Sequence, residues 1–104
     1  MKENMPMFAV IFRAQVNELD EQYSTFALQM RTLAKEQYHC REFTSTTEGD
    51  QEIAISYWDS LEDINNWKND PAHLAVQDRG RVYYYKNYRV QVVEVIREYT
   101  NQGL

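Results

Sequence analysis

Apolar positions recur along the chain with two different spacings, and these spacings predict its secondary structure. Residues 7–15 are apolar on both alternating faces, which is typical of a strand covered on both sides. Residues 20–37 carry an apolar stripe at helical spacing. Residues 39–47 are rich in threonine and serine around Phe43 and predict a more exposed strand, and residues 51–58 alternate and predict its neighbour after the turn at Gly49.

The second half of the chain predicts two short helices and a last strand. Ser60 is the expected N-cap of the first helix. Asp70 and Pro71 end that helix and start another, because proline suits the first helical position. We expect this second helix to run to about Lys86. Residues 88–99 are apolar on both faces and predict the final strand.

The element order is therefore β-α-β-β-α-β, with the second helical unit broken at Pro71. This order predicts an α+β, ferredoxin-like domain, in which a four-stranded antiparallel sheet carries the helices on one face. Three of the four strands are nevertheless apolar on both faces, so the face without helices needs a cover. Because the chain offers no further element, we expect a homodimer that pairs through this sheet face.

Composition is that of an ordinary globular domain. The chain has 104 residues, a net charge of -5 and a pI of about 4.9. This acidic balance argues against nucleic acid as a partner, and the apolar run near the N-terminus is too short to predict a membrane span. We expect one domain over residues 1–104, with an ordered core of about 7–99. The single cysteine, Cys40, excludes an internal disulfide and favours a cytoplasmic location.

Three segments resemble the antibiotic biosynthesis monooxygenase domain family, the dimeric α/β-barrel group. They are FAVIF at 8–12, SYWDSLEDINNWKNDPAHLAVQDRGR at 56–81 and YRVQVVEVIREY at 88–99. The resemblance implies subunits that pair into a dimeric α/β barrel. It also implies a small, cofactor-free monooxygenase that acts on an aromatic or polyketide-like molecule. Because the family holds several activities, haem degradation and a non-enzymatic binding or stress-associated role stay open as alternatives.

The same resemblance implies a ligand pocket between the helices and the sheet. Trp67 matches the family's pocket tryptophan, and its alternative role is that of a core aromatic at the helix junction. We expect His73, Tyr84 and Phe12 to line the pocket with it. For His73 the alternative is an exposed surface position, and for Tyr84 it is a core or dimer contact.

Catalytic residues stay unassigned, with Trp67, Asp63 and Arg81 as candidates. Cofactor-free relatives carry an asparagine one helical turn before the tryptophan, where this chain has Asp63. They also carry an arginine later in the chain, and the resemblance does not choose between Arg81 and Arg89.

The sequence has neither a glycine-rich phosphate loop nor a metal-ligand cluster, so we expect no metal and no cofactor. Haem is the alternative cofactor. Haem-degrading relatives carry their axial histidine about ten residues past the tryptophan, and that position here is Gln77. His73 lies about one helical turn earlier and is the first ligand to test.

Overall fold

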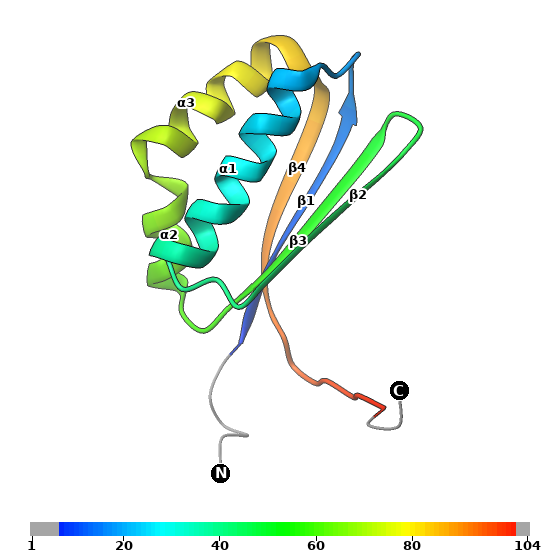
Figure 1. Ribbon diagram of the computed structural model, residues 1–104. Helices are drawn as coiled ribbons and strands as arrows, with labels where there is room; N and C mark the ends of the chain where they lie inside the picture. The colour runs from blue at the N-terminus through cyan, green and yellow to red at the C-terminus, as the bar shows by residue number, and fades with distance from the viewer. Residues whose placement is uncertain (1–6, 102–104) are drawn as a thin grey trace.

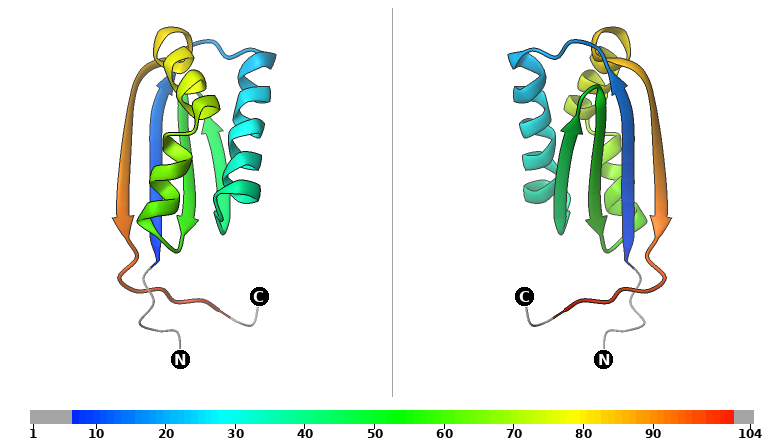
Figure 2. Two further views of the ribbon diagram at one scale, coloured as in Figure 1. Left: turned by 90° about the vertical axis from the view of Figure 1, so that its left-hand side faces the viewer. Right: turned by 90° about the vertical axis from the view of Figure 1, so that its right-hand side faces the viewer.

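The computed structural model describes residues 7–101, so residues 1–6 and 102–104 of the expected domain lie outside the described residues. In chain order the elements are β1 (Phe8–Val16), α1 (Glu21–Gln37), β2 (Glu42–Glu48), β3 (Gln51–Trp58), α2 (Leu61–Lys68), α3 (Pro71–Arg79), a π-helical turn η1 (Gly80–Tyr84) and β4 (Tyr85–Glu94). The strands form one antiparallel sheet in the order β2-β3-β1-β4. All helices lie on one side of it (Figure 1, Figure 2). The expected α+β, ferredoxin-like class is confirmed.

The helices begin where their capping residues predict. In each case a side-chain oxygen before the helix accepts a backbone N–H of the first turn and so satisfies a donor that the helix leaves unpaired. The bonds run from Tyr23 to Asp20 (2.9 Å), from Asp63 to Ser60 (3.0 Å) and from Ala72 to Asp70 (2.8 Å). Pro71 occupies the start of α3, as expected.

The β2–β3 hairpin starts later than its sequence pattern suggests. His39 has a φ of 65°, which is incompatible with a strand, and β2 accordingly begins at Glu42 instead of residue 39. Gly49 in the connecting turn has a φ of 61°, the left-handed conformation that glycine adopts without steric cost.

The end of the helical unit differs most from the sequence prediction. Helix α3 ends at Arg79 instead of near Lys86, and η1 forms a wider turn before the strand. Strand β4 spans Tyr85–Glu94 instead of 88–99. The reason is tertiary pairing, because Tyr85 lies opposite Val16 of β1 in the sheet, and tyrosine fits a pleated strand better than a helix.

The helices cover one face of the sheet and leave the other face uncovered. Toward the helices lies the main core, whose buried residues are Val10, Met30, Ala34, Cys40, Trp58, Ile64 and Trp67. Trp58 is completely buried, and its ring centroid lies 5.2 Å from that of Trp67. The face away from the helices is open (Figure 2), and by strand alternation it carries Ile11, Ile53 and Ile55. No helix in the described part of the chain is long and apolar enough to cross a membrane.

Candidate functional site

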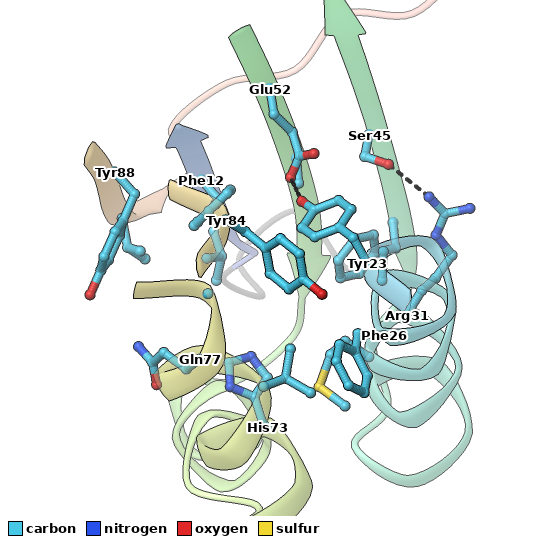
Figure 3. Close-up of a pocket in the computed structure, with 18 of the residues that line it drawn as sticks. Phe12, Tyr23, Phe26, Arg31, Ser45, Glu52, His73, Gln77, Tyr84 and Tyr88 are labelled. Atoms are coloured by element: carbon cyan, nitrogen blue, oxygen red, sulfur yellow. Dashed lines mark hydrogen bonds between the residues drawn. The ribbon is translucent and has the colours of Figure 1, made fainter. Parts of the chain in front are cut away.

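A cavity of about 490 Å³ lies between the helices and the inner face of the sheet. Its wall is mostly apolar and aromatic, with contributions from α1, α2, α3, η1 and all four strands. All four pocket residues expected from the sequence line this wall: Trp67, and Phe12, His73 and Tyr84, which Figure 3 labels. That they bind a substrate stays a prediction.

Trp67 and His73 form one end of the wall. Their ring centroids are 4.4 Å apart in an edge-to-face arrangement, and the indole Nε1–H of Trp67 donates to the backbone carbonyl of Met30 at 3.3 Å. His73 is half-buried, so the alternative of an exposed surface position is wrong. Burial lowers the pKa of His73 and favours the neutral ring. Its Nδ1 is buried and makes no hydrogen bond to any described residue.

A polar cluster of Tyr23, Glu52 and Tyr85 forms another part of the wall, and the sequence analysis did not identify it. The hydroxyl of Tyr23, on α1, donates to Oε2 of Glu52 on β3. The Tyr85 hydroxyl lies 3.2 Å from that of Tyr23. Because the one hydroxyl proton of Tyr23 goes to the carboxylate, Tyr85 is the donor in this second bond.

Burial sets the protonation of this cluster. Glu52 is only 9% exposed, and burial raises the pKa of its carboxyl, an effect that the hydrogen bond from Tyr23 opposes. Burial is also the main reason that the pKa of Tyr23 is raised and that of Tyr85 rises to about 12. Both tyrosines therefore keep their protons at neutral pH and act as hydrogen-bond donors.

The turn η1 places the last two of three consecutive tyrosines at the cavity. Tyr83 is 61% exposed, whereas Tyr84 is buried and its hydroxyl donates to Oδ1 of Asp20 at 3.1 Å. The ring of Tyr85 packs directly on Gly80, where an added Cβ would lie 2.6 Å from the ring atom Cε2. Close approach of this ring is therefore the reason that position 80 suits glycine.

Two of the catalytic candidates lie away from the cavity. Asp63 does not line it, and its Oδ1 lies 3.3 Å from Nδ1 of His39. Arg81 does not line it either, and its guanidinium donates to Asp78 at 2.6 Å. The arginine that does line the cavity is Arg31, which donates to Oγ of Ser45 at 2.8 Å. Only Trp67 of the three candidates is thus part of the wall.

No cluster of metal-ligating side chains occurs among residues 7–101. Gln77, the position that corresponds to the axial histidine of haem-degrading relatives, does line the cavity. One sequence signal pointed to Glu52: it shares the strand face of Ala54, Ser56 and Trp58, which is the inner face of the sheet.

Several solved structures share this fold. A variant of SnoaB, a cofactor-independent oxygenase from Streptomyces nogalater, is 12% identical, with 88% of this chain and 95% of that chain covered and a TM-score of 0.75. Rv0793 from Mycobacterium tuberculosis is 15% identical over 90% of this chain and 99% of that chain, with a TM-score of 0.77. A ferredoxin-like protein from Bacteroides fragilis, described as dimeric, is 15% identical over 86% of this chain and 96% of that chain, with a TM-score of 0.65.

At these identities the solved structures establish the fold alone, which the chain also shares with a putative antibiotic biosynthesis monooxygenase from Caulobacter crescentus, as expected from the sequence. No protein-family model matches the chain. At the level of sequence, YqjZ of Bacillus subtilis (strain 168), an uncharacterized protein, is 37% identical over 94 residues, which cover 89% of this chain and 82% of YqjZ. The chain belongs to the same family as YqjZ and has the ferredoxin-like fold of antibiotic biosynthesis monooxygenases.

Proposed function

We propose that the cavity binds an aromatic or polyketide-like small molecule and that the protein oxidises it as a small, cofactor-free monooxygenase. The observation that carries this proposal is the cavity itself, with a volume of about 490 Å³ and a mostly apolar, aromatic wall interrupted by a few polar groups. Such a wall is typical of small-molecule sites. The common fold with SnoaB, a cofactor-independent oxygenase, supports the reaction class.

In this reaction an electron-rich substrate that has lost a proton passes an electron to O₂. One oxygen atom then enters the substrate, and the other leaves as water with two hydrogens that the substrate provides. The protein contributes a cavity from which water is excluded and hydrogen-bond donors that stabilise the developing anion. Phe12 and Trp67 offer aromatic surface for the substrate.

Oxygen uptake tests the proposal. The chelator-treated protein is mixed with a panel of dihydroxynaphthalenes, and oxygen consumption is compared with a control without protein. Val90→Trp narrows the cavity from a position that is 42% exposed, so we expect uptake to fall while the fold is kept. Leu74→Trp adds the same side chain at a position that is 47% exposed and outside the cavity wall, and we expect it to keep the activity. Ligand-dependent stabilisation without uptake would identify a binding protein instead.

Haem degradation is the second candidate, because a histidine held neutral by burial lines the cavity and neutral imidazole is a common haem ligand. Since Nδ1 of His73 is buried, its Nε2 would have to hold the iron, and the haem would supply the site that binds O₂. An absorbance titration with haem distinguishes the two candidates. A Soret band that His73→Ala abolishes would favour haem, and the absence of specific binding would remove it.

We also propose that two copies pair through the open sheet face. By strand alternation this face carries Ile11, Ile53 and Ile55. After β4 the chain runs away from the sheet (Figure 1), and Ile96 and Tyr99 are 93% and 82% exposed. A second copy would cover this apolar surface, and the dimeric protein from Bacteroides fragilis with this fold supports the pairing. A stable 12.5 kDa species in sedimentation equilibrium at micromolar concentration would refute it.

A further inference from the structure

We propose that Glu52 is the base of this cavity, and that its carboxylate accepts the proton of a ligand hydroxyl, so that the site takes phenols and enols. The inference rests on the proposed function, which requires a deprotonated substrate. It assigns that step to a residue that neither the resemblance nor the relatives identify.

The geometry leaves one carboxylate oxygen of Glu52 for a ligand. The side chain extends from the inner face of β3 and lines the cavity (Figure 3). Oε2 accepts the hydrogen bond from Tyr23. Within residues 7–101 no donor is bonded to the other oxygen, Oε1. A carboxylate accepts several hydrogen bonds, so Oε1 has capacity for a ligand hydroxyl.

The energetics argue against a purely structural role for this charge. Glu52 is 9% exposed, and in the described part of the chain no lysine, arginine or histidine forms an ion pair with it. An unpaired buried carboxylate costs folding free energy. A glutamine would make the same bond between α1 and β3 without that cost. Burial raises the pKa of Glu52 toward neutral pH, the range in which a general base is most effective.

The proposed step is a simple proton transfer. The O–H bond of the ligand breaks, the proton binds to Oε1 of Glu52, and the ligand keeps the electron pair as an oxyanion. The step changes no oxidation state and needs no co-reactant. Tyr23 holds Oε2 before and after the transfer and is a positioning residue, and Tyr85 in turn fixes the Tyr23 hydroxyl at 3.2 Å.

His73 is the other group on the wall that can take up a proton near neutral pH. It is unsuitable as the base for a hydroxyl held at Glu52, because it lies away from Glu52 on the wall (Figure 3) and burial lowers the pKa of its ring. Tyr23 and Tyr85, the tyrosines nearest to Glu52, cannot accept the proton, because burial raises the pKa of both and keeps them protonated at neutral pH.

A matched pair of ligands tests the proposal. Para-nitrophenol and para-nitroanisole have nearly the same shape, but only the phenol has a proton to give, and its phenolate has a distinct absorption band. Both are titrated into wild-type protein, Glu52→Gln and Glu36→Gln, at one pH unit below the pKa of the free phenol. Glu36→Gln is the control, because it removes the same charge from an exposed position on α1.

In wild-type protein and in Glu36→Gln we expect the phenol to bind ~10-fold more tightly than the anisole, as for a hydrogen bond to a charged group, and to show the phenolate band. In Glu52→Gln we expect neither the band nor the preference, while the binding of the anisole stays unchanged. The comparison of para-nitrophenol with para-nitroanisole on wild-type protein tests the proposal even if Glu52→Gln does not fold.

Two results would overturn the role of Glu52. One is a phenolate band in Glu52→Gln equal to that of the wild type, and the other is wild-type protein that binds both ligands equally and without the band. Either result with intact binding of the anisole would leave the cavity as a small-molecule site. Failure of both ligands to bind would contradict the proposed function as well.

Discussion

A single methyl group at Gly80 tests how η1 shapes the cavity. The backbone there has a φ of -60° and a ψ of -44°, a right-handed helical conformation in which alanine is favoured over glycine by about 1 kcal/mol. The new Cβ, however, would lie 2.6 Å and 3.1 Å from ring atoms of Tyr85. Displacing a packed ring costs about 1–3 kcal/mol, and loss of the bond between Tyr85 and Tyr23 adds about 1 kcal/mol. We therefore expect Gly80→Ala to destabilise the protein by about 1–3 kcal/mol.

A double-mutant cycle isolates the contact between Gly80 and Tyr85. Urea unfolding is measured for the wild type, Gly80→Ala, Tyr85→Ala and the double variant. Without the Tyr85 ring, Gly80→Ala is expected to stabilise by about 1 kcal/mol, so the coupling energy is about 2–4 kcal/mol. If Gly80→Ala stabilises the wild type, or has the same effect in both backgrounds, the Tyr85 ring does not oppose a side chain at position 80.

Three further predictions concern stability. Asp20→Ala removes the N-cap of α1 and the acceptor for Tyr84, and we expect a loss of about 1–2 kcal/mol in urea unfolding. The pKa of Glu52 is raised in the folded protein, so the contribution of Glu52 to the free energy of unfolding declines as pH rises from its ordinary pKa of 4.5 through the folded pKa. We expect Glu52→Gln to remove this decline. For His73 the pKa is lowered, so stability is lost as pH falls below the ordinary value of 6.5 toward the folded pKa, and His73→Gln should flatten that loss. Profiles of unfolding free energy against pH that run parallel in variant and wild type would contradict the last two.

Local chemistry explains why most of the fold could be predicted from the sequence. The capping oxygens of Asp20, Ser60 and Asp70 act within their own helices, and each is readable from a few neighbouring residues. The C-terminal end of α3 could not be predicted from neighbouring residues in this way. Tyr83, Tyr84 and Tyr85 are consecutive aromatics that show neither a helical nor a strand period, and the pairing of β4 with β1 decides where the strand begins.

The site was harder to predict because its contacts join distant parts of the chain. Glu52 stands beside a turn, where a charged residue usually faces water, and its partner Tyr23 is 29 positions away. The resemblance pointed to Trp67, which lines the cavity, but it also directed attention to Asp63 and Arg81, whose side chains bond to other surface groups. The alternation of side chains along β3 places Glu52 on the inner face of the sheet, whereas the depth of its burial depends on the packing of α1 and η1.

We propose above that the cavity beside Trp67 and His73 binds an aromatic molecule. The most direct measurement is an NMR titration of the protein with para-nitroanisole, with assigned backbone and aromatic side-chain signals. We expect saturable shifts concentrated on the cavity wall, at Phe12, His73 and Val90, and we expect Val90→Trp but not Leu74→Trp to abolish them. Shifts confined to the open sheet face, or no saturable shifts, would show that the cavity does not bind this aromatic molecule.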